Sequence, residues 1–281
     1  MATPTSPRGL RLELERRLDG IRWRQWSALG VAAQVEPETA WLIDLEALAV
    51  STLGPAAGDR RLKELARAWL AANDEWLNHS RLGRVEREFG AAGLEPDAAG
   101  ETRAARRKVA PPELLRPALG QLALRAVLGM DARAEVYLYL RHHAEGNSNS
   151  IARAVRCDQK SAYRVLERWN AAGVVRRTES GWALARDWRG LAPAGPGPAP
   201  RYLDWTSAFK ALDRLALALA GTAGEDAYLA SSLFRDRYAD IATIARAADV
   251  ELPVPGPYPG ARFFSPFSAA VLALLAVLGA Q

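Results

Sequence analysis

The side chains best suited to chemistry gather within residues 159–167, on a segment that predicts a helix over 159–171. They are an amide, two cations and a phenol: Gln159, Lys160, Tyr163 and Arg164. Asp158 can cap this helix and Gly173 can end it. Helical spacing puts the polar groups opposite an apolar face made of Ala162, Val165, Leu166 and Trp169. Arg and Gln can bond base edges, whereas Lys and Tyr more often contact phosphates, so the segment predicts a surface for duplex nucleic acid.

Two shorter predicted helices must position this segment. Asp131 can cap a helix over 131–143. Ser148 or Asn149 can then cap a short helix over 150–155, which is joined to the helix over 159–171 by a tight turn. The order is therefore helix, short helix, turn and longer helix.

A predicted β-hairpin follows the longer helix. Two runs, 174–177 and 182–185, have strand character, and the four residues 178–181 join them. Arg176 and Arg177 stand at the base of this hairpin, where we expect them to contact a nucleic-acid backbone.

The order of elements over 131–186 resembles the winged helix-turn-helix of bacterial transcriptional regulators of the MarR/ArsR kind. The residues that carry the resemblance are SIARAVRCDQKSAYRVLERWNAAGVVRR. The resemblance implies that 159–167 enters the major groove and that 178–181 is the tip of the wing. It departs at Arg156, because that turn position is usually small, often Gly, and a left-handed conformation costs a larger residue about 1 kcal/mol.

The distribution of charge agrees with a nucleic-acid partner. The chain of 281 residues has a net charge of +5, and residues 101–190 hold 17 Lys/Arg against 9 Asp/Glu, a balance of +8. The remainder has a balance of −3, so the positive excess lies in one segment. The alternative is a chain that is simply rich in arginine.

Helical spacing and Pro/Gly-rich breaks divide the chain into four parts. They are an N-terminal helical domain over 1–100, a winged helix-turn-helix domain with a preceding helix over 101–189, a Pro/Gly linker over 190–201 and a C-terminal helical domain over 202–281. In the first domain we expect a helix from Pro37 to about Leu53. We expect its tryptophans to pack in a core: Trp23, Trp26, Trp41, Trp69 and Trp76. The apolar segment 269–280 should be buried.

Other chemistry finds little support in the sequence. Glycine-rich dinucleotide and phosphate-loop motifs are absent, and no pair of carboxylates stands out as an acid and a base. His142 and His143 are adjacent on a helix, so they diverge and make a poor metal pair. Cys157 is expected to be a small buried residue, or alternatively a redox switch if the neighbouring Arg156 lowers its pKa. We therefore expect no catalytic residue, no metal and no cofactor.

The sequence thus predicts a mainly α fold with a central winged helix-turn-helix, a small β-hairpin wing and helical domains on each side. We expect a bacterial transcriptional regulator that binds double-stranded DNA as a homodimer. The alternative is a protein-interaction subunit, antitoxin-like or part of a defence system, whose flanking helices hold a partner protein. A ligand-sensing role for the flanks is also open. The start of the sequence lacks a secretory signal and no uninterrupted apolar run reaches about 20 residues, so we expect a cytoplasmic protein.

Overall fold

The computed structural model describes residues 6–90, 103–186, 191, 198–221, 226–257 and 260–279. Its first helices are α1 (Pro7–Ala28), α2 (Leu45–Leu53), α3 (Arg60–Ala72), α4 (His79–Phe89), α5 (Arg103–Arg106) and α6 (Gly120–Leu128). Then come α7 (Ala132–His142), α8 (Ser148–Val155), α9 (Gln159–Ala171), β1 (Val175–Arg177), β2 (Trp182–Leu184), α10 (Trp205–Gly221), α11 (Ala227–Ala247) and α12 (Phe264–Leu278). Over these residues the protein is mainly helical with a small two-stranded antiparallel sheet, which confirms the predicted class.

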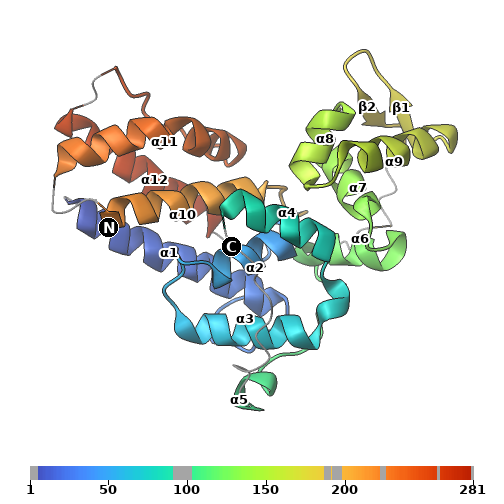
Figure 1. Ribbon diagram of the computed structural model, residues 1–281, viewed down its shortest axis with the longest axis horizontal. Helices are drawn as coiled ribbons and strands as arrows, with labels where there is room; N and C mark the ends of the chain where they lie inside the picture. Colours follow the sequence, from blue (N-terminus) through green and yellow to red (C-terminus); the bar gives the residue numbers. More distant parts are fainter. Residues whose placement is uncertain are drawn as a thin grey trace.

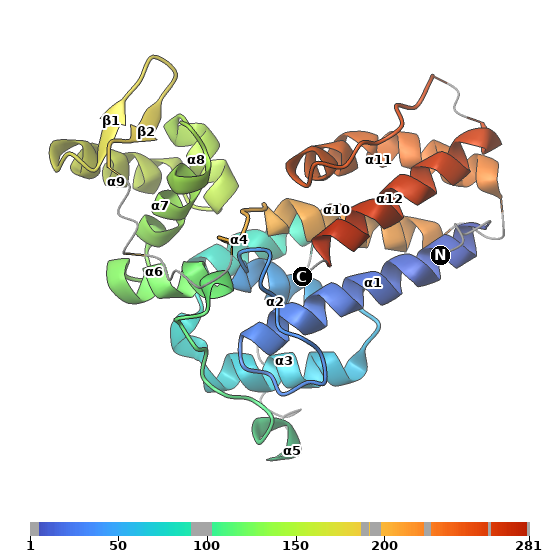
Figure 2. The same ribbon diagram turned by 180° about the vertical axis from the view of Figure 1, so that it is seen from behind.

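One hydrophobic core joins the beginning and the end of the chain. α1 packs against α10 and α12, and α2 contacts α1, α3, α4 and α10. Figures 1 and 2 show these helices as one body, in which α10 lies between α11 and α1. The helices of the two predicted flanking regions, 1–100 and 202–281, therefore share a core.

The tryptophans of the first region lie in this core or at its edge. Trp26, Trp41 and Trp69 are almost completely buried, and Trp23 and Trp76 pack against them partly buried. Trp26 and Trp69 meet edge to face, with their ring centroids 5.6 Å apart. Such pairs add to the stabilisation that the buried area provides. The packing predicted for these residues is confirmed.

The helix predicted from Pro37 begins instead at Leu45. The Glu38 carboxylate accepts hydrogen bonds from the backbone N–H groups of the next three residues, at 2.8–3.3 Å. The two N–H groups after those donate to the carbonyls of Arg201 and Ala118. Because these donors already have partners outside a helix, the segment before α2 stays extended.

Residues 132–184, here called the α7–β2 unit, have a hydrophobic core of their own. It consists of Val136, Leu140, Ile151, Val155, Leu166, Val174, Val175 and Trp182. α8 and α9 pack on each other, and both pack on α7. In Figure 1 the unit stands at the opposite end of the molecule from α11 and α12.

The hairpin is tied to the loop before α8. β1 and β2 pair antiparallel across residues 178–181, in agreement with the predicted strands to within a residue. Trp182 exchanges two backbone hydrogen bonds of 2.9 Å with Gly146. A Cβ atom on Gly181 would lie 2.4 Å from the Gly146 carbonyl oxygen, so only glycine allows this approach.

The helix boundaries of the α7–β2 unit follow from local signals. The side chains of Asp131 and Asp158 accept backbone hydrogen bonds and cap α7 and α9, as predicted. α8 is capped by Asn147, which accepts from the Ser150 N–H at 2.8 Å, one residue before the two predicted caps. Gly173 follows α9 with a φ of +70°, a left-handed conformation that glycine adopts without strain.

The apolar helix α12 packs on α1 and α11. Its leucines and Val271 are buried, whereas Ala269, Ala273 and Ala276 are exposed, so the predicted burial holds for the large side chains. Among the described residues, the stretch Ala261–Leu278 is the one that is long and apolar enough to cross a membrane. Half of it is buried within the protein, as in a core helix.

Candidate nucleic-acid interface

The four side chains singled out on α9 lie on one exposed face: Gln159, Lys160, Tyr163 and Arg164. The opposite face is buried or half-buried and consists of Ala162, Val165, Leu166 and Trp169. In the part of the chain that the structure describes, Lys160 and Arg164 make no side-chain hydrogen bond or ion pair. Both cations are therefore available to an anionic partner.

Arg177 on the hairpin is already engaged with α9. Its guanidinium forms an ion pair with Glu167 and lies 4.8 Å from the centroid of the Trp182 ring. The Tyr163 hydroxyl and Arg177 both donate to Glu167 and lower the pKa of that carboxyl. An anionic ligand must therefore compete with Glu167 for Arg177.

Arg176 is exposed on the other face of the same strand, because successive strand residues point to opposite sides. It lies near Glu145, in the loop before α8. The hydroxyls of Ser180 and Thr178, and to a smaller extent Arg176, lower the pKa of the Glu145 carboxyl. The structure thus brings Arg177 next to the α9 residues and places Arg176 apart from them.

Arg156 adopts the left-handed conformation that makes it unusual at the α8–α9 turn, with a φ of 55°. Its side chain is buried and reaches away from the turn, to Glu88 on α4 and to Asp204 before α10. The bonds to the Asp204 carboxylate are 2.8 Å, and Ser207 accepts a further one at 3.0 Å. The residue that is unfavourable for the turn itself therefore attaches the turn to the helical body.

Arg81 on α4 makes a second attachment. Its Nε donates to the Val155 carbonyl at the end of α8, at 3.0 Å, and its other nitrogens bond Asp44 and Glu46. Burial alone would raise the pKa of both carboxyls, but Arg81, together with Arg125 beside Glu46, outweighs burial and lowers them. The network is therefore charged and internally paired.

Arg125 on α6 extends this network to α7. It donates to both oxygens of Glu46 at 2.8 Å and to Glu135 at 2.8 Å. All three side chains are nearly or wholly buried. These buried ion pairs connect α2, α6 and α7, so they tie the α7–β2 unit to the helical body.

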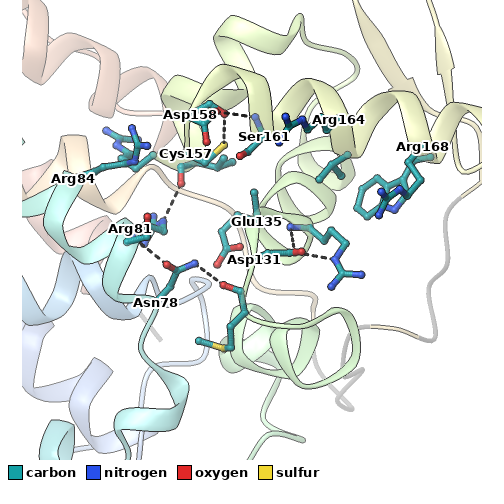
Figure 3. Close-up of a pocket in the computed structure, with 18 residues that line it drawn as sticks. Asn78, Arg81, Arg84, Asp131, Glu135, Cys157, Asp158, Ser161, Arg164 and Arg168 are labelled. Carbon is teal, nitrogen blue, oxygen red and sulfur yellow. Dashed lines mark hydrogen bonds and ion pairs between the residues drawn. The ribbon is translucent and has the colours of Figure 1, made fainter.

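A cleft of about 370 Å³ lies where α4, α7 and the first half of α9 meet (Figure 3). Arg84, Arg164 and Arg168 line it, together with Glu135. The sequence singled out only Arg164 of these. Arg168 follows one helical turn later, so its spacing could have indicated it, whereas Arg84 belongs to a distant segment and no local signal connects it to α9.

Cys157 lines the same cleft, and its environment contradicts the redox-switch alternative. Burial, with a smaller contribution from Asp158, raises the pKa of the Cys157 thiol to about 11. Arg156 cannot stabilise a thiolate there because its guanidinium is bound to Glu88 and Asp204. The thiol is therefore protonated and poorly nucleophilic at neutral pH.

The two adjacent histidines pack against aromatic rings. His143 stacks on Tyr139 with centroids 4.0 Å apart and its Nδ1 lies 2.8 Å from the Tyr139 carbonyl oxygen. His142 stacks on Tyr202. Over the described residues, no group of three or more His, Cys, Asp or Glu is arranged to hold a metal ion.

No family model, curated protein or solved structure matches this chain. Its function must therefore be sought in the chemistry of the site.

Proposed function

We propose that the α7–β2 unit is a winged helix-turn-helix and that the protein is a transcriptional regulator that binds double-stranded DNA. The observation that carries the proposal is the face of α9 that bears Lys160 and Arg164, exposed and without intramolecular partners in the described chain. It lies opposite the buried face of the same helix and beside a hairpin with two further arginines. Exposed cations, an amide and a phenol on one helix are the groups that contact bases and phosphates.

The dimensions of α9 suit this role. Its 13 residues span about 20 Å, and the major groove is about 12 Å wide, enough to admit a helix. We assign Gln159 and Arg164 to base edges, and Lys160 and Tyr163 to phosphates. Arg176 and Arg177 of the hairpin would contact the backbone, Arg177 after its release from Glu167.

We further propose that the protein acts in the cytoplasm as a homodimer, because helix-turn-helix proteins commonly read two half-sites about one helical turn apart. Light scattering of the purified protein tests the dimer directly. A monomer that stays monomeric on DNA would contradict this part of the proposal and leave the DNA contact itself intact.

Fluorescence anisotropy with duplexes from the gene's own promoter tests DNA binding. Binding should weaken with salt, with a slope of log K against log salt of about −3 per protomer for three phosphate contacts. Arg164→Ala should cost roughly 1–3 kcal/mol and relax base preference. The control is Arg60→Ala, which removes an exposed arginine, paired with Glu64, from α3 in the helical body. If the protein showed no salt-sensitive binding to any duplex, including this promoter, the proposal would be wrong.

A second candidate function is that of a protein-interaction subunit. Leu217 on α10 and Tyr228 and Leu229 on α11 are large apolar side chains that are 45–56% exposed. Exposed apolar side chains favour a protein partner where they form one contiguous patch. Copurification of a stable partner after nuclease treatment, together with failure of the anisotropy assay, would favour this function over DNA binding.

A further inference from the structure

The cleft between α4, α7 and α9 combines cations that lack hydrogen-bond and ion-pair partners among the described residues with a carboxylate that has one unpartnered oxygen. Within the described chain, Arg84, Arg164 and Arg168 make no side-chain hydrogen bond or ion pair, although all three line the cleft. In Figure 3 Arg84 comes from α4 and the other two from α9, so they approach the cleft from two sides. Asp131 and Asp158 also line the cleft, but its arginines outnumber its carboxylates, so the balance of charge favours an anionic group.

Glu135, in contrast to the arginines, has an oxygen that needs a hydrogen-bond donor. It lies in the middle of the lining in Figure 3, and only 5% of it is exposed. Its Oε1 accepts from Arg125, but its Oε2 is buried without a hydrogen-bond partner among the described residues. A buried carboxylate oxygen without a partner is costly, and a donor in the cleft would remove that cost once the Glu135 carboxylate rotates toward it.

The rest of the lining is suited to a compact organic molecule. Met130, Val155, Val165 and the indole of Trp169 are apolar, and Asn78, Ser80 and Ser161 add neutral polar groups. The volume of about 370 Å³ falls within the range of small-molecule sites. The phosphate backbone of DNA does not fit the cleft as well, because it has no N–H donor for Glu135.

We propose that this cleft binds a small molecule that carries an acidic group, carboxylate or phosphate, together with an amino group. The acidic group bonds Arg84, and the positive charge of Arg164 and Arg168 on the facing wall adds to the attraction. The amino group donates to Glu135, and the carbon skeleton lies against Trp169. Because Arg164 also belongs to the proposed DNA surface, the bound molecule would weaken DNA binding; this consequence rests on the proposed function, whereas the ligand site does not.

Calorimetry on the whole protein at low salt tests the site. The probes are the twenty amino acids, phosphoserine and the nucleoside monophosphates, and inorganic phosphate and methylamine represent the two halves alone. We expect at least one bifunctional probe to bind with a Kd below about 1 mM and both halves to bind at least about tenfold more weakly. Failure of every probe, or equal binding of phosphate alone, would overturn the proposal.

Substitutions of residues in and beside the lining test whether the probe binds in this cleft. Arg84→Ala should weaken its binding by about tenfold or more, whereas Arg87→Ala, which removes an exposed arginine of α4 outside the lining, should not change it. Glu135→Gln should abolish the preference for the amino group. Where this variant fails to fold because Arg125 loses one of its two carboxylate partners, the analogue of the probe without its amino group makes the same comparison on the native protein. Equal binding of probe and analogue would contradict the role of Glu135.

The DNA assay separates the two proposals. If the probe binds in calorimetry but the protein never binds a duplex, the ligand site stands and the DNA proposal fails. If a duplex binds but no probe does, only the ligand site is wrong.

Discussion

Replacing Arg156 tests two opposing contributions of one residue. Its backbone lies at a φ of 55°, which costs a residue with a Cβ atom about 1 kcal/mol or more. Its guanidinium is 5% exposed and pairs with Glu88 and Asp204, each about one third exposed. The side chain thus stabilises the turn on the body while the backbone opposes it.

The structure sets the size of each contribution. Breaking a fully buried ion pair costs about 3–5 kcal/mol, whereas an exposed pair contributes about 0.2–1 kcal/mol. Since both carboxylates are partly open to water, we expect Arg156→Ala to lower the free energy of unfolding by about 2 kcal/mol. Arg156→Gly loses the same side chain but relieves the left-handed backbone, so its loss should be about 1 kcal/mol smaller.

Urea denaturation followed by far-ultraviolet circular dichroism measures both variants against the native protein. Arg153→Ala is the control, because Arg153 is exposed on α8 and has no ion pair among the described residues; its effect should stay within about 0.5 kcal/mol. If Arg156→Ala were as stable as the native protein, the contacts to Glu88 and Asp204 would contribute nothing. Equal stability of the Ala and Gly variants would contradict the left-handed turn.

Three other predictions follow from charges and pKa values. Because the arginines around Glu46 lower the pKa of its carboxyl below the usual 4.5, the unfolded chain binds more protons than the folded one in that range. The free energy of unfolding should therefore fall as the pH drops below about 4.5, and less steeply in Glu46→Gln, which denaturation at a series of pH values measures. With its pKa at about 11, the Cys157 thiol should react with iodoacetamide at pH 7.5 about 300-fold more slowly than a free thiol with a pKa of about 8.5; comparable rates would show that the thiol is accessible and ionised. Glu167→Gln should tighten DNA binding, because a phosphate no longer competes with the Glu167 carboxylate for Arg177, and an unchanged affinity in the anisotropy assay would exclude Arg177 from the interface.

The elements of the α7–β2 unit were predictable because their signals are local. Asp131 and Asp158 cap helices through N–H groups two or three residues away, and Gly173 ends α9 by its own conformation. The hairpin loop over 178–181 likewise depends on residues within the loop and the two strands it joins. Each signal lies within a few residues of the structure it determines.

The remaining features depend on residues that are far apart in the chain. The segment before α2 is extended because the carbonyls of Arg201 and Ala118 accept its hydrogen bonds. The spacing of apolar residues in the sequence does not indicate either of these distant contacts. The cleft requires Arg84 on α4 to meet Arg164 and Glu135, which the sequence places in another predicted domain. Composition locates the excess of positive charge over 101–190 but cannot distinguish the cations that are paired from those that are available.

The attachment of the α7–β2 unit explains how an unfavourable residue can occupy the α8–α9 turn. The apolar contact between unit and body is small and centres on Leu42, Tyr137 and Leu138. Apolar packing of this size is non-directional and would allow the unit to rotate, whereas Arg81 and Arg156 bond specific atoms on either side. The unfavourable left-handed backbone of Arg156 is therefore compensated by the long-range ion pairs of its side chain, and these ion pairs also fix how α9 lies on the helical body.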